Sequence, residues 1–185
     1  DGKIVLGFTG FVRDWHGVDR IIRYLARAAR PDLHLLVVGD GDVRNALEDE
    51  AARLGGATQM TITGVVQREH MAQHVDAFDI ALQPAVVPYA SPLKLIEYMS
   101  LGKAIIAPAC DNIKELLTDG ADAILAPPDD EAALHHRLNV LVSDRALREK
   151  LGDAARESVR RRDLTWAGNA KRVERLAQDL LERKQ

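Results

Sequence analysis

SPLKLIEYMSLGK, residues 91–103, begins like a helix and brings a cation and a carboxylate onto one of its faces. Ser91 is a favourable N-cap and Pro92 a favourable first helical residue, so together they predict where the helix begins. Lys94 and Glu97, three residues apart, point the same way. Free N–H groups, the positive end of the helix dipole and a lysine favour phosphate at this terminus, and a carboxylate one turn later suits sugar or ribose hydroxyls. The segment therefore predicts a site for a phosphorylated, polyhydroxylated ligand.

Outward from this segment, short apolar runs alternate with amphipathic ones along most of the chain. The pattern predicts strands at residues 4–8, 33–38, 60–63, 78–82, 104–107 and 123–125. It predicts helices at residues 17–29, 42–54, 68–75, from 91 onward and at 112–117, and from Glu131 only helices, with breaks near 143–144 and 163–166. The middle strands are apolar on both faces, as buried parallel strands are. We expect an α/β fold, a doubly wound parallel six-stranded Rossmann-like sheet with C-terminal helices.

Composition limits the classes of function. A chain of 185 residues that is 46% hydrophobic and 29% charged is expected to form one globular domain. Its net charge of −3 argues against nucleic acid as a partner. The lone cysteine, Cys110, excludes an internal disulfide, and no apolar run is long enough to span a bilayer. The start at Asp1, with neither Met nor a signal peptide, predicts a fragment of a longer protein. We expect that protein to be cytoplasmic.

The loops that follow the predicted strands carry the candidate chemistry. Ligands bind at the carboxyl ends of the strands in such a sheet, so these loops are expected to share one rim. The first loop offers Gly10 for close backbone approach, Arg13 as a planar fork for phosphate and His16 as a second donor. The second is the tight turn 39–41 and the third is 64–66, while a long loop, 83–90, leads into Ser91. We expect these loops to converge on one ligand.

Other common sites are disfavoured. His70 and His74 lie four residues apart on a predicted helix, but no third ligand is evident and the catalytic Glu of a zinc protease motif is missing, so no metal site is predicted. The chain has no nucleophile elbow and no Walker lysine, and the first loop lacks the glycine fingerprint of a dehydrogenase.

Taken in order, these segments resemble the C-terminal half of a group 1 (family 4) glycosyltransferase. The resemblance is carried by GFTG and RDWHGVD (7–10, 13–19), VVGDG (37–41), ITGVV (62–66), SPLKLIEYM (91–99), NIKEL (112–116) and PPD (127–129). It implies a retaining, metal-independent enzyme of the two-domain GT-B fold, of which residues 1–185 would be the donor-binding domain. It also implies that residues 164–185 form the family's C-terminal crossover helix and that the N-terminal acceptor domain is absent here.

The resemblance assigns roles to individual residues. Arg13 and His16 match the family's two diphosphate-binding cations, usually Arg and Lys, although histidine is a weaker and pH-dependent cation. The family's two glutamates, eight residues apart, fall at Tyr89 and Glu97. Glu97 is expected to bind the ribose, while Tyr89 replaces the carboxylate that contacts the donor sugar. Catalytic roles would fall to Arg13, Lys94 and Glu97, and further donor contacts are expected from Gly10, Gly39, Asp40, Val65, Val66, Ser91, Pro92 and Leu93.

The activity that the resemblance implies is glycosyl transfer from a nucleoside-diphosphate sugar, of UDP or GDP type, with no cofactor. Because the acceptor half is missing, this chain is expected to bind the donor without turning over alone. Two alternatives stay open. The change at Tyr89 suits a non-catalytic nucleotide-binding module, and a GT-B nucleotide-sugar epimerase would need acid and base groups beyond Glu97. The sequence leaves the sugar, the acceptor and peripheral membrane contact by the full-length protein undecided.

Overall fold

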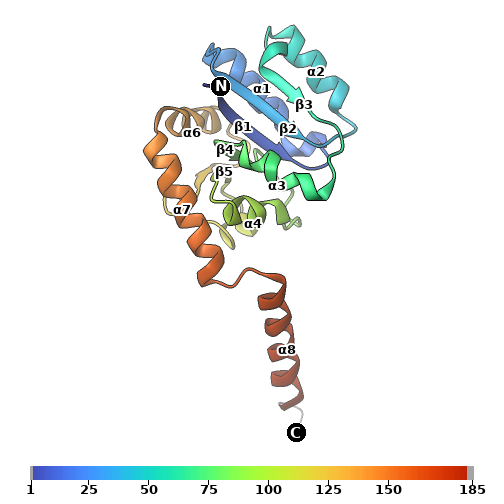
Figure 1. The fold of residues 1–185 in the computed structure, drawn as a ribbon, viewed down its shortest axis with the longest axis vertical. Coiled ribbons are helices and arrows are strands. Elements are labelled where there is room, and N and C mark those ends of the chain that lie inside the picture. The colour runs from blue at the N-terminus through green and yellow to red at the C-terminus, as the bar shows by residue number, and fades with distance from the viewer. Residues whose placement is uncertain (1, 183–185) are drawn as a thin grey trace.

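Six parallel strands form one sheet in the order β3-β2-β1-β4-β5-β6. The structure is a computed structural model and describes residues 2–182 (Figure 1). The strands are β1 (Ile4–Thr9), β2 (Leu33–Val38), β3 (Met60–Ile62), β4 (Ile80–Leu82), β5 (Ala104–Pro108) and β6 (Ile124–Ala126). The predicted doubly wound parallel six-stranded sheet is confirmed.

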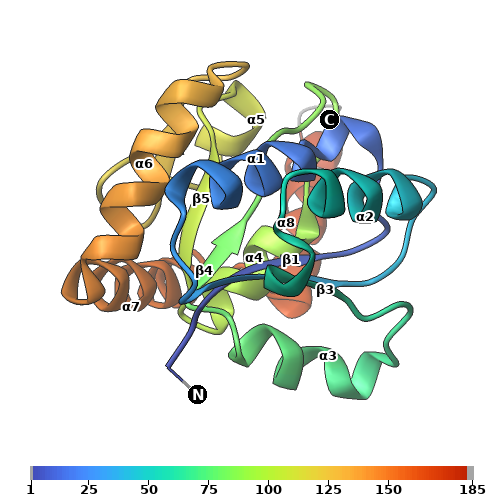
Figure 2. The same ribbon diagram turned by 90° about the horizontal axis from the view of Figure 1, so that it is seen from above.

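Helices cover both faces of the sheet (Figure 2). One face carries α1 (Val18–Ala28), α2 (Arg44–Arg53) and α6 (Glu131–Ser143), and the other carries α3 (Arg68–Asp76), α4 (Leu93–Ser100) and α5 (Asp111–Lys114). The long helix α7 (Arg145–Arg161) contributes Leu151 to the first core and Ala155 and Val159 to the second. Both cores are formed by residues of the sheet and of the helices that cover it. The α/β layers therefore have hydrophobic cores of their own, as a domain that folds independently does.

The central strands are buried on both sides, which explains their apolar runs. Along β4, Ile80 and Leu82 face the core under α1, while Ala81 faces the core under α4, and all three are completely buried. Since successive residues of a strand point to opposite faces, a strand covered on both faces has no position for an exposed polar side chain.

The order of the strands fixes where a ligand can bind. β2 and β3 lie on one side of β1, and β4, β5 and β6 lie on the other. The connections that leave the carboxyl ends of β1 and β4 therefore run in opposite directions and leave a crevice between them, the switch point of an open α/β sheet.

The structure corrects some predicted boundaries. The prediction of Ser91 as N-cap is wrong: α4 begins at Leu93, and its N-cap is Pro92, in extended conformation and without a side-chain cap bond. β4 begins at Ile80 and not at residue 78. Phe78 lies against Gly7 in the core, where a Cβ on Gly7 would fall 2.0 Å from the Phe78 ring. A short 3₁₀ helix, η1 (Asp14–His16), lies in the first loop and was not predicted.

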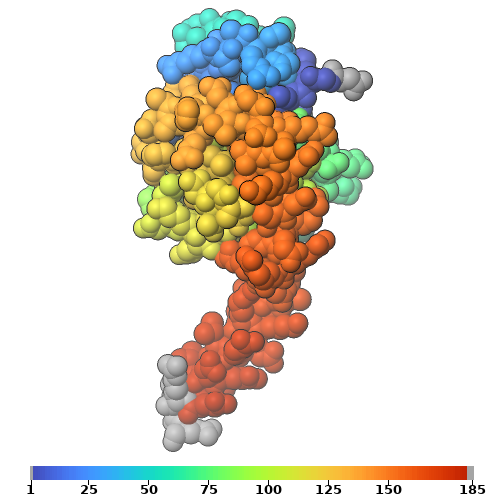
Figure 3. Space-filling view, turned by 90° about the vertical axis from the view of Figure 1, so that its left-hand side faces the viewer, coloured from blue at the N-terminus to red at the C-terminus, as the bar shows by residue number. Residues whose placement is uncertain are grey.

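The last helix, α8 (Trp166–Glu182), leaves the α/β layers and projects away from them (Figures 1 and 3). The expected helical end is confirmed to Glu182, and residues 183–185 lie outside the described residues. Large exposed apolar side chains line α8: Trp166, Val173, Leu176, Leu180 and Leu181. No helix within residues 2–182 is long and apolar enough to cross a membrane.

Candidate functional site

A cavity of about 370 Å³ opens at the switch point, at the carboxyl end of β1. Its walls come from three parts of the chain: the end of β1, the connection from β3 into α3, and the first turns of α4. The lining residues are Thr9, Gly10, Val66, Arg68, Met71, Lys94 and Glu97. Lys94 and Glu97 both line the cavity, which confirms that they share a face of α4.

A buried tyrosine of α4 holds the end of β1 in place. The Tyr98 hydroxyl accepts a hydrogen bond from the Thr9 backbone N–H at 2.8 Å and lies 3.0 Å from the Thr9 hydroxyl. The side chain of Tyr98 is completely buried, and burial raises the pKa of its hydroxyl well above the usual range. This contact ties the cavity floor at Thr9 and Gly10 to the helix that carries Lys94 and Glu97.

Two glycines let the first two loops approach each other and the lysine. Gly10 has φ of +127°, and a Cβ there would lie 3.3 Å from the Nζ atom of Lys94. Gly39 has φ of +142°, and a Cβ there would meet the Gly10 carbonyl oxygen at 2.1 Å. Conformation therefore restricts both positions to glycine, and at Gly39 the contact with backbone leaves no space for a Cβ either. The second loop also stays hydrogen-bonded to the first beyond the strands, from the Val12 N–H to the Asp40 carbonyl at 2.7 Å.

Lys94 is unusually shielded for a lysine. Its Nζ atom lies 3.7 Å from the centroid of the Phe8 ring. Burial lowers the pKa of Lys94 to about 7, and the nearby Glu97 carboxylate offsets only part of that shift. At neutral pH the free protein therefore holds this amine partly uncharged, and an anion bound beside it would favour the protonated form.

His16 is a neutral donor in the free protein and not the expected cation. Its ring packs 3.8 Å from the Trp15 ring centroid and 5.1 Å from that of Phe8, and its Nδ1 accepts a hydrogen bond from the Arg13 N–H at 3.0 Å. Burial, followed by the charges of Lys94 and Arg13, lowers the pKa of His16 to about 4. The accepted bond at Nδ1 leaves the remaining proton on Nε2.

Arg13 is exposed and is not one of the residues that line the cavity. Its guanidinium forms an ion pair with Asp42 at 3.3 Å, with both side chains more than half exposed, and lies 5.1 Å from the Phe11 ring centroid. An exposed pair of this kind contributes only about 0–1 kcal/mol. A phosphate at the mouth of the cavity could therefore draw Arg13 away from Asp42 at little cost.

The other predicted contact residues lie around the cavity rather than in its lining. Gly39 and Gly64 pair as a β-bridge, which brings the second and third loops together beside Val65. Tyr89 is 88% exposed on a turn that Asn112 holds by donating from Nδ2 to the Ala90 carbonyl at 2.6 Å. Ser91, Pro92 and Leu93 lead into α4 and leave the Leu93 and Lys94 N–H groups without an acceptor within residues 2–182.

The family model for "Glycosyl transferases group 1" matches residues 1–158. The chain belongs to this family. The resemblance read from the sequence is therefore confirmed, and with it the assignment to a family of transferases.

Known relatives of this group 1 glycosyltransferase chain extend beyond it. The phosphatidyl-myo-inositol mannosyltransferase of Mycobacterium tuberculosis is 29% identical over 181 residues, which is 95% of this chain and 47% of the relative. The chain thus spans about half the length of such relatives.

Solved structures share its fold. The Anabaena protein HepE, crystallised in complex with UDP, superposes with a TM-score of 0.84 at 22% identity, over 96% of this chain and 49% of HepE. The C-terminal domain of the group 1 glycosyl transferase LpcC from Francisella tularensis gives a TM-score of 0.75 at 23% identity, over 85% of each chain. The second match is to a domain of nearly the same extent, so the fold of this chain is that of the C-terminal half of a GT-B protein.

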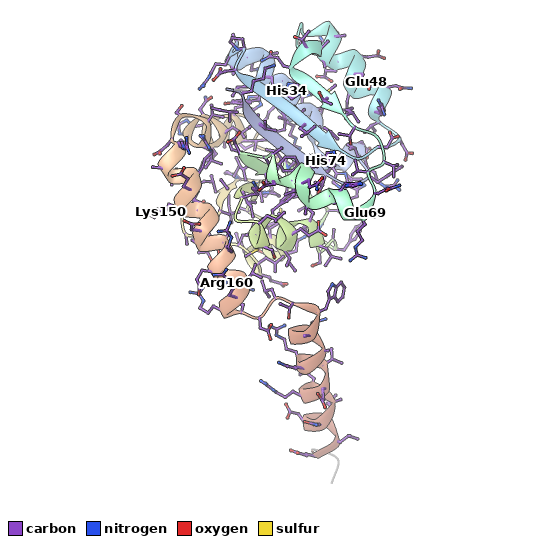
Figure 4. All side chains as sticks on the ribbon, in the orientation of Figure 1. His34, Glu48, Glu69, His74, Lys150 and Arg160 are labelled. Atoms are coloured by element: carbon purple, nitrogen blue, oxygen red, sulfur yellow. The ribbon has the colours of Figure 1, made fainter. Side chains whose placement is uncertain are left out.

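Three lining residues escaped the sequence analysis: Thr9, Arg68 and Met71. Thr9 is the last residue of β1, where ligand contacts are expected in this fold. Arg68 and Met71 are three residues apart at the start of α3, the same spacing that marked Lys94 and Glu97 on α4. Figure 4 shows α3 through its labelled residues Glu69 and His74.

His70 and His74 both lie on α3. Within residues 2–182, no three or more His, Cys, Asp or Glu side chains are grouped so that they could hold a metal ion. His74 instead contacts its own helix, with Nδ1 2.9 Å from the His70 carbonyl oxygen.

Proposed function

We propose that this chain is the donor-binding half of a GT-B glycosyltransferase that transfers a sugar from a nucleoside diphosphate with retention of configuration. The observation that carries the proposal is the cavity in which Lys94 and Glu97 meet the open backbone at Gly10. The UDP in the HepE complex supports a nucleotide as the ligand of this fold. The mannosyltransferase activity in the name of the mycobacterial relative supports the reaction class.

The diphosphate fits the N-terminal end of α4. Gly10 lets the chain approach closely, the Leu93 and Lys94 N–H groups are free to donate, and Lys94 supplies a charge at the same point. Arg13 can join them from its weak pair with Asp42. Gly10, the two N–H groups and Lys94 lie together before the ligand arrives, so of these groups only Arg13 has to move on binding.

The nucleoside extends from there toward α3. Glu97 lies one turn beyond Lys94 and lines the same cavity, so its carboxylate can accept hydrogen bonds from the ribose hydroxyls. Val66 provides an apolar wall for the base, and Val65 exposes its backbone beside it. The turn at Gly39 and Asp40 borders this end of the cavity through the bridge from Gly39 to Gly64.

In the reaction, the bond from the anomeric carbon to the β-phosphate oxygen breaks while the acceptor oxygen bonds to that carbon and gives its proton to the departing diphosphate. Charge builds up on the departing diphosphate, where Lys94, Arg13 and the α4 N–H groups stabilise it. These groups supply positive charge without a divalent ion, so we expect transfer to proceed in the presence of a chelator. Glu97 orients the donor in this scheme and carries no proton-transfer role.

The acceptor half belongs to the rest of the full-length protein. Large apolar side chains are exposed around the rim of the site: Phe11, Trp15, Val65, Tyr89 and Leu93. A second exposed apolar set lies along α8, and we assign the chain from residue 164 onward, which includes α8, to the crossover helix. Exposed apolar sets of this kind mark surfaces that a partner covers, and the acceptor domain is the partner that we assign to both.

Calorimetric titration of this chain with UDP, GDP and ADP tests the donor site. We expect one of them to bind, and Lys94→Ala to weaken that binding about tenfold or more because it removes a charged hydrogen bond. Lys150→Ala, an exposed lysine on α7, is the control and should bind like the wild type. Equal affinity in the Lys94 variant and the wild type would contradict the proposed site.

Activity assays separate a transferase from a nucleotide-binding module. The chain alone should transfer no sugar, whereas the full-length protein should do so with the anomeric configuration retained. Lys94→Ala in the full-length protein should abolish transfer even when the donor is saturating. Turnover by residues 1–185 alone would refute the assignment of an acceptor half, and a full-length protein that binds the donor without any transfer would favour the binding module.

A further inference from the structure

Arg68 is the arginine of the cavity lining. It lies at the start of α3 and lines the cavity with Val66 and Met71, while Lys94 and Glu97 line it from α4. Its guanidinium has no ion pair and no hydrogen bond to any described residue. Every other arginine between residues 2 and 144 has an ion pair with a carboxylate: Arg13, Arg20, Arg23, Arg27, Arg30, Arg44, Arg53 and Arg137.

Arg68 also differs from the other positive groups near the site. Lys94 loses much of its charge to burial at neutral pH, His16 is neutral, and Arg13 lies outside the cavity lining in a weak ion pair with Asp42. A guanidinium keeps its charge at any pH at which the protein is folded, and it presents several N–H donors in one plane. Arg68 is therefore free to bind a ligand and does not need to be protonated first.

Its position points to the nucleoside end of the ligand. Gly10 and the start of α4 form the phosphate end of the cavity, and Glu97 follows one turn along α4. Arg68 and Met71 line the cavity from a different helix, α3, and Val66 adds an apolar surface in the connection that leads into it. Two apolar side chains and one planar cation suit an aromatic ring with polar atoms at its edge.

We propose that Arg68 determines nucleobase specificity, by donating hydrogen bonds to a carbonyl oxygen of uracil or guanine and so disfavouring adenine. The inference rests on the proposed donor-binding function and adds to it a class of base. Arginine can only donate, and adenine carries an amino group where guanine has its carbonyl. A site that pairs a donor with a carbonyl rejects a ligand that leaves the donor unpaired.

Titration of the chain with UDP, GDP, ADP and inorganic pyrophosphate tests this role. The wild type should bind UDP or GDP about tenfold or more tightly than ADP, a ratio within reach of one charged hydrogen bond. Arg68→Met, which keeps much of the aliphatic stem, should lose about tenfold for the preferred nucleotide and less than about threefold for ADP. Arg68→Lys keeps the charge, so it should bind pyrophosphate like the wild type while losing most of the discrimination.

Arg161→Met provides the control for the loss of one exposed positive charge. Arg161 lies on α7, also without a side-chain partner within residues 2–182, and this variant should keep wild-type affinities. Unchanged discrimination in Arg68→Met would overturn the inference, as would an equal loss for all four ligands, which would make Arg68 a phosphate contact. If the wild type binds none of the four ligands, the proposed function fails, and the specificity role fails with it. If the wild type binds a nucleotide and the Arg68 variants bind all four ligands with the same affinities, the specificity role fails while the donor site stands.

Discussion

The Nζ atom of Lys94 lies 3.7 Å from the centroid of the Phe8 ring, at the point where α4 meets the end of β1. The ring face attracts the ammonium group but replaces only part of its lost hydration. Burial accordingly lowers the pKa of Lys94 to about 7. A bound diphosphate therefore raises the fraction of Lys94 that is charged, because an anion beside the amine stabilises its protonated form.

Donor binding should depend on pH through this one side chain. Above pH 7 the free lysine is mostly neutral, so binding must take up a proton, and affinity falls as pH rises. We expect the dissociation constant of the preferred nucleoside diphosphate to increase about tenfold between pH 7 and 8.5. Calorimetry in two buffers of different ionisation enthalpy measures the proton uptake directly.

Lys94→Met serves as the control for this pH dependence. The variant should bind weakly, with an affinity that is nearly constant over the same range, because His16 has a pKa of about 4 and does not titrate there.

The free energy of unfolding gives an independent check. The unfolded chain binds the Lys94 proton up to pH 10.5, so the wild type should gain stability relative to Lys94→Met from pH 7 to pH 10.5. A parallel pH dependence in both proteins would refute the assignment to Lys94.

The bond from the Thr9 N–H to the Tyr98 hydroxyl should support both stability and binding. Tyr98→Phe leaves this buried N–H without an acceptor, at a cost of about 1–3 kcal/mol in the free energy of unfolding. It also loosens Thr9 and Gly10, so donor affinity should fall. Urea unfolding and nucleotide titration measure the two effects.

Tyr24→Phe is the matched control. The Tyr24 hydroxyl likewise forms a hydrogen bond, donating to Asn139 at 2.8 Å, but it lies between α1 and α6 and outside the cavity lining. We expect this variant to lose stability while keeping its nucleotide affinity. If both tyrosine variants lose affinity in proportion to stability, Tyr98 has no specific role in the site.

Local patterns in the sequence were enough to predict the sheet. The apolar run at Leu33–Val38 is bounded by a charged turn and by Gly39, and the strand has the predicted bounds. Lys94 and Glu97 were predicted to share a face because helical spacing alone decides it. The predicted start of α4 was wrong by one residue. The turn before this helix is held at Ala90 by Asn112, a contact across 22 residues that local preferences cannot reveal.

Burial and ligand contacts across the sheet were harder to predict. His16 was expected to carry charge, and only the packing of its ring against Trp15 and Phe8 shows why it does not. Arg68 was missed because it reaches the cavity only when the fold brings α3 and α4 to the same end of the sheet. Charge state and cross-sheet proximity both depend on tertiary structure, and a single sequence carries no direct signal for either.

Gly39→Ala should disrupt the contact between the first two loops. The new Cβ would lie 2.1 Å from the Gly10 carbonyl oxygen, and the backbone there has φ of +142°. A clash with backbone cannot be relieved by a rotamer change, so we expect a loss of about 3 kcal/mol or more in the free energy of unfolding. Gly120→Ala tests conformation alone, since Gly120 has φ of +72° but open space around it. That control should lose only about 1 kcal/mol, and equal losses would show that the close approach to Gly10 has no effect.

Tyr89→Glu restores the carboxylate that the family usually has eight residues before Glu97. Tyr89 is 88% exposed, so the free energy of unfolding should change by less than about 0.5 kcal/mol. The affinity for the nucleoside diphosphate should stay within about twofold of the wild type, because the diphosphate and base contacts lie elsewhere. The affinity for the nucleotide sugar should change, since a carboxylate accepts hydrogen bonds from sugar hydroxyls and a phenol ring does not do so in the same place.

Comparing UDP-glucose, GDP-mannose and the free diphosphates on the Tyr89→Glu variant separates the sugar from the nucleotide. A gain for the sugar nucleotide of the preferred base, without a gain for its diphosphate, would show that position 89 faces the transferred sugar. Tyr89→Phe is the matched control, because it keeps the ring and removes only the hydroxyl. If Tyr89→Glu binds every ligand like the wild type, position 89 does not reach the sugar, and the turn that Asn112 holds at Ala90 keeps it on the outer surface of the rim.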